Sequence, residues 1–171
     1  PRIFRKEAEQ YFRKQMELLT SAGFDALGIG SMEEPGFLRE AGIELPMYFD
    51  QGMYSWNHLA GAAMERYGAD RLTIPVELNE REIRDSGVQG EMIVYGYLPM
   101  MISAQCIRKT TLGCSGKSEI MWLKDRKDMR FPVVNQCRFC YNTIYNSAPL
   151  SLLGLSEQVT GLKPNAVRLN F

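Results

Sequence analysis

The feature that most constrains the fold is a regular alternation of short apolar segments with amphipathic segments. The apolar segments predict β-strands at residues 26–30, 46–50, 72–76, 91–95 and 167–171. Apolar residues at three- and four-residue spacing predict helices at residues 3–19, 33–41, 55–67 and 79–85. Because strands that alternate with short helices at this spacing are typical of parallel βα units, we predict an α/β fold.

A βα barrel of the TIM type needs eight such units, and four or five are visible here. The chain begins at Pro1 and stops at Phe171 inside a predicted strand, so both ends look cut. We therefore predict the later part of a TIM-type βα barrel, as a fragment of a larger barrel domain. An open doubly wound sheet is the alternative. No internal repeat and no Ser/Gly linker divides residues 1–171, which we predict to form a single domain.

Local signals mark the ends of some of these elements. Ser55 is the predicted N-cap of the third helix, and Gly68 is its predicted C-cap. Polar residues at or directly after the ends of three predicted strands, namely Ser31, Asp50 and Glu77, stand where barrel enzymes place functional groups. Turn chemistry also places polar residues there, so position alone identifies none of them as catalytic.

Composition excludes several classes of protein. Of the 171 residues, 45% are hydrophobic and 11% aromatic, which indicates a folded core rather than disorder. No apolar run approaches the roughly 18 residues that cross a bilayer, and no cleavable signal peptide is visible. We expect a cytoplasmic protein.

Residues 97–150 break the alternation and are predicted to be an insertion. Residues 117–124 and 129–134 predict a hairpin, in which Pro132 indicates an edge strand. The insertion is also basic, although 20 Lys and Arg balance 20 Asp and Glu in the whole chain. Residues 1–105 carry 10 basic and 16 acidic side chains, whereas residues 106–140 carry 8 and 3.

All four cysteines lie in this insertion, at Cys106, Cys114, Cys137 and Cys140. Their pattern is C-x7-C-x22-C-x2-C, in which C-x2-C offers two thiolates from one tight turn and the distant pair completes tetrathiolate coordination. We predict one metal-binding set, an iron-sulfur cluster ahead of zinc, since C-x7-C fits a zinc ribbon poorly. Structural zinc, disulfides and unligated cysteines are the alternatives.

Several stretches around the cysteines resemble one known family. They are residues 91–106, the Lys124-Asp-Arg-Lys127 turn, residues 137–152 and, more weakly, the strand end at residues 75–79. They resemble the collagenase-like peptidase family, family 32 of the peptidases of unknown catalytic type. Members are commonly labelled proteases, yet several hold a 4Fe-4S cluster on four cysteines and hydroxylate RNA bases or a quinone precursor without oxygen.

This resemblance implies that Cys106, Cys114, Cys137 and Cys140 are ligands of a 4Fe-4S cluster. It favours an iron-sulfur dependent RNA-base hydroxylation factor, an oxidoreductase, over a hydrolase. A peptidase that cleaves peptide bonds and a non-catalytic, zinc-stapled interaction module remain the alternatives.

The sequence contains neither of two common catalytic motifs of hydrolases. The chain lacks a G-x-S-x-G elbow and an H-E-x-x-H zinc helix. Its one histidine, His58, lies within a predicted helix and is interpreted as a satisfied or surface residue. We predict Glu77 as the catalytic carboxylate, ahead of Glu91, because Glu77 follows a strand and would face a barrel mouth. A helix N-terminal charge is the other interpretation of Glu77.

The basic insertion predicts a contact with RNA across residues 106–140, with Arg108, Lys109 and Arg138 as substrate-binding residues. Aromatic residues nearby could stack on bases, namely Phe139, Tyr141 and Tyr145. The unpaired strand edges of a partial barrel also predict self-association, and we expect a homodimer.

Overall fold

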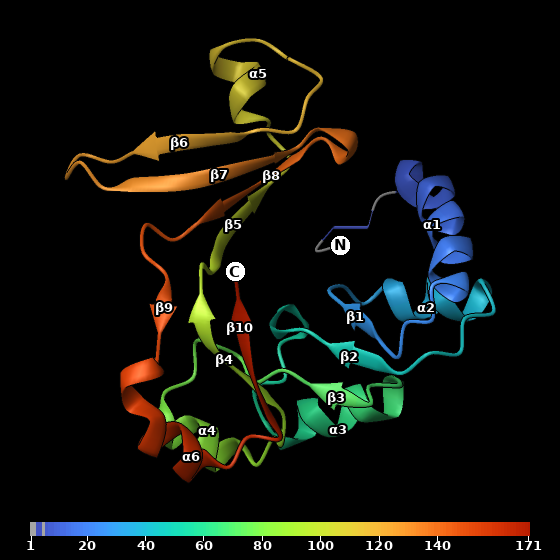
Figure 1. Cartoon of the computed structure of the whole chain (residues 1–171), viewed down its shortest axis with the longest axis vertical. Coiled ribbons are helices and arrows are strands. Elements are labelled where there is room, and N and C mark those ends of the chain that lie inside the picture. The colour runs from blue at the N-terminus through green and yellow to red at the C-terminus, as the bar shows by residue number, and fades with distance from the viewer. Residues whose placement is uncertain (1–2, 5) are drawn as a thin grey trace. The chain divides into compact units, whose positions relative to one another are not determined.

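The computed structural model describes residues 3–4 and 6–171, which form two compact units. The first unit comprises Pro1–Val94 with Leu152–Leu169, and the second comprises Tyr95–Ser151 with Asn170–Phe171 (Figure 1). Residues 97–150, the predicted insertion, lie within the second unit. Within the described residues, no helix combines the length and the apolar character that a membrane span requires.

Parallel strands form the centre of the first unit. Strands β1 (Leu27–Ile29), β2 (Met47–Phe49) and β3 (Arg71–Leu72) pair in that order, all in parallel. A parallel bridge from Thr73 to Glu91 continues the order to β4 (Glu91–Gly96), which neighbours β10 (Ala166–Asn170). The α/β prediction is confirmed, and the described residues contain no closed barrel.

Helices alternate with these strands. After the 3-10 helix η1 (Lys6–Ala8), the unit contains α1 (Glu9–Ser21), α2 (Glu34–Glu40), η2 (Gln51–Met53), α3 (His58–Tyr67), α4 (Glu80–Ser86), η4 (Leu153–Leu155) and α6 (Ser156–Leu162). Each strand from β1 to β3 is therefore followed by a helix, as the sequence periodicity predicts. Helices α4 and α6 lie side by side, and Arg84 Nη1 of α4 donates to the Gly161 carbonyl at 3.1 Å.

The N-terminus of α3 differs from the prediction. Asn57 is the N-cap, and its side-chain oxygen accepts from the Ala60 N–H at 3.0 Å. Ser55 is buried, and its hydroxyl instead donates to the Thr73 carbonyl at 3.2 Å. The predicted Ser55 cap is therefore wrong, because a contact with the next strand takes its hydroxyl. The Gly68 C-cap is confirmed, in the left-handed conformation that glycine favours.

One face of the parallel sheet packs against the helices. Ile29, Phe49 and Leu72 come from three neighbouring strands and are 1%, 1% and 4% exposed. They share a core with Phe37 and Leu38 of α2. Because side chains alternate between the two faces of a strand, the residues next to them in sequence face away from the helices.

An antiparallel sheet forms the second unit, in the order β5 (Pro99–Ser103), β8 (Tyr141–Tyr145), β7 (Arg130–Gln136) and β6 (Ile120–Lys124). The short strand β9 (Leu150–Ser151) pairs with the end of β4, and α5 (Ile107–Thr111) and the 3-10 helix η3 (Cys137–Phe139) complete the unit.

Strands β6 and β7 are the predicted hairpin. Its turn is held by Asp125, whose Oδ1 accepts from the backbone N–H groups of Lys127 at 2.8 Å and Met129 at 2.9 Å. Pro132 was predicted to mark an edge strand, whereas β7 is an inner strand. Pro132 nevertheless lies outside residues 133–136, the part of β7 that pairs with β8, so its missing N–H removes no bond to β8.

Candidate functional site

All four cysteines belong to the second unit. Cys106 caps α5, where its Sγ accepts from the Lys109 N–H at 3.4 Å, and Cys114 follows α5 in a loop. Cys137 begins η3, and Cys140 caps it. Cys106 and Cys137 are half-buried, Cys114 and Cys140 are exposed, and all four are free thiols. The disulfide alternative therefore has no support in the structure.

The C-x2-C segment forms a tight turn. The Cys140 N–H donates to the Cys137 carbonyl at 3.4 Å, and Cys140 adopts a left-handed conformation with φ of 51°. The Cys137 thiol donates to the Lys117 carbonyl at 2.9 Å, and the Cys137 N–H donates to Ser118 Oγ at 3.3 Å. These contacts join the turn to the chain just after Cys114.

Electrostatics indicates that the four thiols share one neighbourhood. Desolvation raises the pKa of the Cys137 thiol, and the charges of Cys106, Cys114 and Cys140 raise this pKa further, as does Glu119. Within the described part of the chain, however, no three His, Cys, Asp or Glu side chains are grouped closely enough to hold a metal ion. Three thiols thus act on the pKa of Cys137, and those of Cys106, Cys137 and Cys140 are hydrogen-bonded to backbone groups.

A fully buried asparagine connects the two halves of the cysteine set. The Asn142 Nδ2 donates to the Gln105 carbonyl at 2.7 Å and to the Ser103 carbonyl at 3.3 Å. Asn142 is two residues after Cys140, and Gln105 directly precedes Cys106. These hydrogen bonds span 37 and 39 residues of sequence, so they fix the first cysteine relative to the C-x2-C turn.

The loop that carries Cys114 is held by an ion pair. The Arg108 guanidinium of α5 pairs with Glu119 and also donates to the Gly113 carbonyl at 3.1 Å. Ser115 Oγ donates to the same Glu119 carboxylate at 3.2 Å. Arg108, predicted to bind substrate, is thus engaged within its own unit, whereas Lys109 and Arg138 are exposed. Their role in binding substrate stays a prediction.

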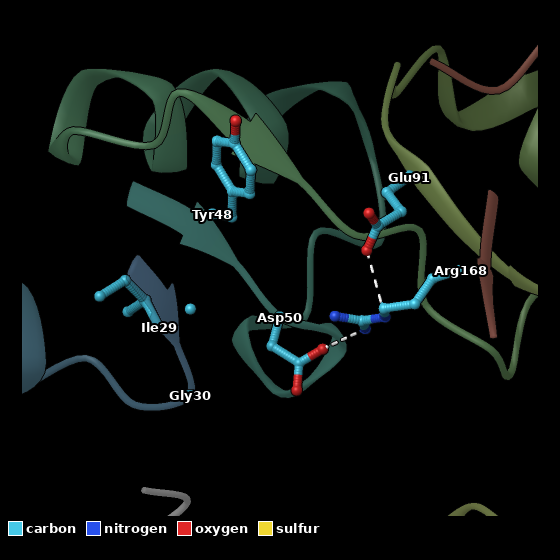
Figure 2. Close-up of a pocket in the computed structure, with 7 residues that line it drawn as sticks. Ile29, Gly30, Tyr48, Asp50, Glu91 and Arg168 are labelled. Carbon is cyan, nitrogen blue, oxygen red and sulfur yellow. Dashed lines mark hydrogen bonds and ion pairs between the residues drawn. The ribbon is translucent and has the colours of Figure 1, made fainter. Parts of the chain in front are cut away.

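A separate pocket lies on the face of the parallel sheet that the helices leave free (Figure 2). Its volume is about 450 Å³, within the range of small-molecule sites. It is lined by Gly28, Ile29, Gly30, Tyr48, Asp50, Glu91 and Arg168. An ion-pair network forms one wall, in which Arg168 Nη2 lies 2.5 Å from Asp50 Oδ1 and Arg168 Nε lies 3.1 Å from Glu91 Oε1.

The chain shows the sequence pattern of Peptidase family U32 over residues 2–162. It belongs to Peptidase family U32. The predicted resemblance to family 32 of the peptidases of unknown catalytic type is therefore confirmed. No curated protein and no solved structure matches the chain.

In this U32 chain, the residues that the sequence singled out for acid-base chemistry lie apart from the pocket lining. Glu77 is exposed in the turn that leads to α4, and His58 is exposed at the first residue of α3. The pocket instead uses Asp50, a predicted strand-end residue, with Glu91, which the sequence ranked below Glu77. Arg168 was not predicted from the sequence. The available signal was its position as the one charged residue in residues 166–171, a predicted strand of alternating apolar residues.

We expect Arg168 to stabilise the folded protein through its ion pairs with Asp50 and Glu91. Replacing Arg168 by Gln leaves Asp50 and Glu91 without their shared cation, and because these side chains are only partly buried the expected loss is about 1–2 kcal/mol of unfolding free energy. Chemical denaturation measures this loss. The control is Arg81→Gln, whose pair with Asp85 is 90% and 71% exposed and should contribute less than about 0.5 kcal/mol. Equal losses in both variants would contradict the assignment.

Proposed function

We propose that this U32 protein is an iron-sulfur dependent oxidoreductase that hydroxylates bases in RNA. The observation that supports the proposal is the presence of four free thiols in one compact unit, where three of them act electrostatically on the fourth. The proposed ligands are Cys106, Cys114, Cys137 and Cys140. The resemblance to members that carry out this reaction favours it over hydrolysis.

The donor set fits a 4Fe-4S cluster in its chemistry. Four cysteine thiolates are the usual ligands of such a cluster, and all four thiols here are free and at least partly accessible. When bound, the cluster would supply electron transfer. The chain's own residues would hold it: the η3 turn presents Cys137 and Cys140, the start of α5 presents Cys106, and the Arg108–Glu119 pair steadies the loop that carries Cys114.

Positive charge near the thiols supports RNA as the substrate. Residues 106–140 carry 8 basic and 3 acidic side chains, and Lys109 and Arg138, our candidates for contacts with phosphates, are exposed. Of the aromatic residues predicted to stack on bases, Tyr141 is 8% exposed and so is poorly placed for that role. Phe139 and Tyr145 are half-buried.

We propose further that the parallel strands β1 to β4 and β10 are part of a TIM-type βα barrel. Support comes from their shared order and from the helices that follow β1, β2 and β3. In such a barrel the free face of the sheet would be the interior, and the pocket of Asp50, Glu91 and Arg168 would be the substrate site. Glu77 remains our candidate for a proton-transfer group at the strand end.

Peptide-bond hydrolysis is the second candidate, and the pocket is the observation that favours it. Two carboxylates that share one pocket, Asp50 and Glu91, could hold a metal ion that activates water. The pairing of both carboxylates with Arg168 counts against this, since a cation already balances much of their charge.

Anaerobic reconstitution tests the proposed cofactor. We expect the protein incubated with iron and sulfide, then desalted, to hold about four iron and four sulfide per chain and to turn brown. Elemental analysis and visible absorbance measure this. Binding of one zinc without iron would instead indicate a structural site. Cleavage of unstructured peptides by the protein free of iron would favour the peptidase.

A further inference from the structure

We infer that one face of the β6–β7 hairpin binds single-stranded RNA by stacking bases on Trp122. This inference rests on the proposed function in taking RNA as the substrate, and it adds where the strand lies and in which form it is recognised. We call this surface the Trp122 face. Its six residues are Ile120, Trp122, Lys124, Arg130, Pro132 and Val134.

The register of the hairpin places these six side chains on one side. Trp122 pairs with Pro132, and the neighbouring pairs on the same side are Ile120 with Val134 and Lys124 with Arg130. Directly opposed residues of antiparallel strands point to the same face, and so do residues two apart along a strand. The six therefore form three adjacent cross-strand rows.

This face takes little part in the core of its own unit. The other face of β7 carries Val133 and Asn135, which are 0% and 1% exposed. On the Trp122 face, by contrast, Ile120 is 65% exposed and Trp122 is 59% exposed. Two large apolar side chains thus stand in solvent next to each other on an edge strand. An exposed apolar patch of this kind marks a binding surface.

The positive charge around the Trp122 face indicates which class of molecule binds there. Arg130 stands at one end of the face, is exposed, and has no ion-pair partner among the described residues. Arg126 and Lys127 extend the positive charge into the exposed turn. Lys124 is paired with Asp128 at 2.6 Å, but both side chains are largely exposed, at 58% and 81%. Cations around an exposed indole suit a polyanion with stacking rings better than the charge-depleted core of a protein interface.

The form of the nucleic acid follows from the geometry of stacking. An indole ring can stack only on a base that is not already stacked within a helix, so the face favours single strands, loops or unpaired ends over duplex RNA. Such regions also expose base edges to modifying enzymes. The exposed Trp122 therefore supplies the stacking role that buried Tyr141 cannot take.

The chain's two tryptophans provide a matched test. Trp56 is 44% exposed in the first unit and serves as the control for Trp122. The probe is a single-stranded oligoadenylate of about 12 nucleotides, within the range of single-strand binding sites. We expect Trp122→Ala to weaken binding about tenfold and Trp56→Ala to leave it unchanged. Arg130→Gln should lower the slope of log affinity against log salt by about 1.

Fluorescence gives a second readout that does not depend on a loss of binding. In Trp56→Phe only Trp122 emits, and the oligoadenylate should quench it. In Trp122→Phe only Trp56 emits, and its emission should not change. Circular dichroism of each variant checks that the fold is kept.

Four outcomes would overturn the inference. Unchanged affinity of Trp122→Ala for the oligoadenylate removes Trp122 from the binding surface but leaves RNA as the substrate. Equal binding of an RNA duplex removes the preference for single strands. Self-association that Trp122→Ala abolishes shows that a second copy of the chain covers this face. Failure of the wild-type protein to bind any RNA removes the RNA substrate as well, while the iron analysis stands independently.

Discussion

Replacing Cys137 and Cys140 together by serine is expected to abolish cluster binding, from about four iron atoms per chain to fewer than one. The two thiols come from one turn, and serine hydroxyls are poor ligands for iron in such clusters. Iron and sulfide analysis after anaerobic reconstitution measures the loss. Replacing Cys106 and Cys114 together should have the same effect, because each pair supplies half of the proposed ligands.

The control for this experiment removes a sulfur atom outside the cysteine set. Met129 is 46% exposed in the same unit, and Met129→Ser should keep the full iron content. Iron retained by Cys137→Ser/Cys140→Ser would contradict the assignment of the four cysteines to one cluster. Zinc bound by the wild type and lost from both double variants would keep the four-cysteine site but replace iron-sulfur with structural zinc.

Much of the fold could be predicted because its signals are local. Apolar spacing along a strand or helix reports which side faces the core, so the alternation of strands and helices and the β6–β7 hairpin were visible in the sequence. The N-terminus of α3 was not, because Ser55 and Asn57 are both good capping residues. A hydrogen bond from Ser55 to Thr73, 18 residues away, decides between them.

The pocket lined by Asp50, Glu91 and Arg168 could not be predicted from the sequence. Asp50 and Arg168 are 118 residues apart, and nothing in the local pattern around either residue indicates that they meet. Glu91 lies at the start of its strand, where position alone gave no reason to prefer it. Which carboxylates face a shared cation depends on strand order, and strand order is a property of the tertiary structure.

The aromatic residues of the second unit were misjudged for a related reason. Proximity to the cysteines in sequence favoured Tyr141 for stacking, yet Tyr141 begins β8, an inner strand, and is 8% exposed. Trp122 is farther from the C-x2-C turn but lies on the edge strand β6. Exposure therefore follows the order of strands in the sheet, which the sequence alone does not reveal.

Asn142 holds the segment that precedes Cys106, so replacing Asn142 should lower both stability and iron binding. The Asn142 side chain is 0% exposed, and its amide donates to the carbonyls of Ser103 and Gln105. Leucine has a similar size but cannot donate, so Asn142→Leu leaves two carbonyl groups without these bonds. Ser103 is half-buried and Gln105 is exposed, so water can reach both acceptors. Two hydrogen bonds of about 0.5–1.5 kcal/mol each therefore give an expected loss of about 1–3 kcal/mol of unfolding free energy.

Asn142→Leu should also weaken iron binding, because the segment before Cys106 is no longer hydrogen-bonded to β8, the strand that follows Cys140. We expect Asn142→Leu to hold less than half of the wild-type iron after reconstitution, measured together with chemical denaturation of the metal-free protein. The matched control is Asn135→Leu, since Asn135 is 1% exposed and faces Asn142 across the β7–β8 pair. Among the described residues, its side-chain amide donates to the weak acceptor Met121 Sδ, at 3.3 Å, and to no carbonyl next to Cys106. Equal losses of stability and iron in the two variants would show that Asn142 acts through general core packing rather than by positioning Cys106.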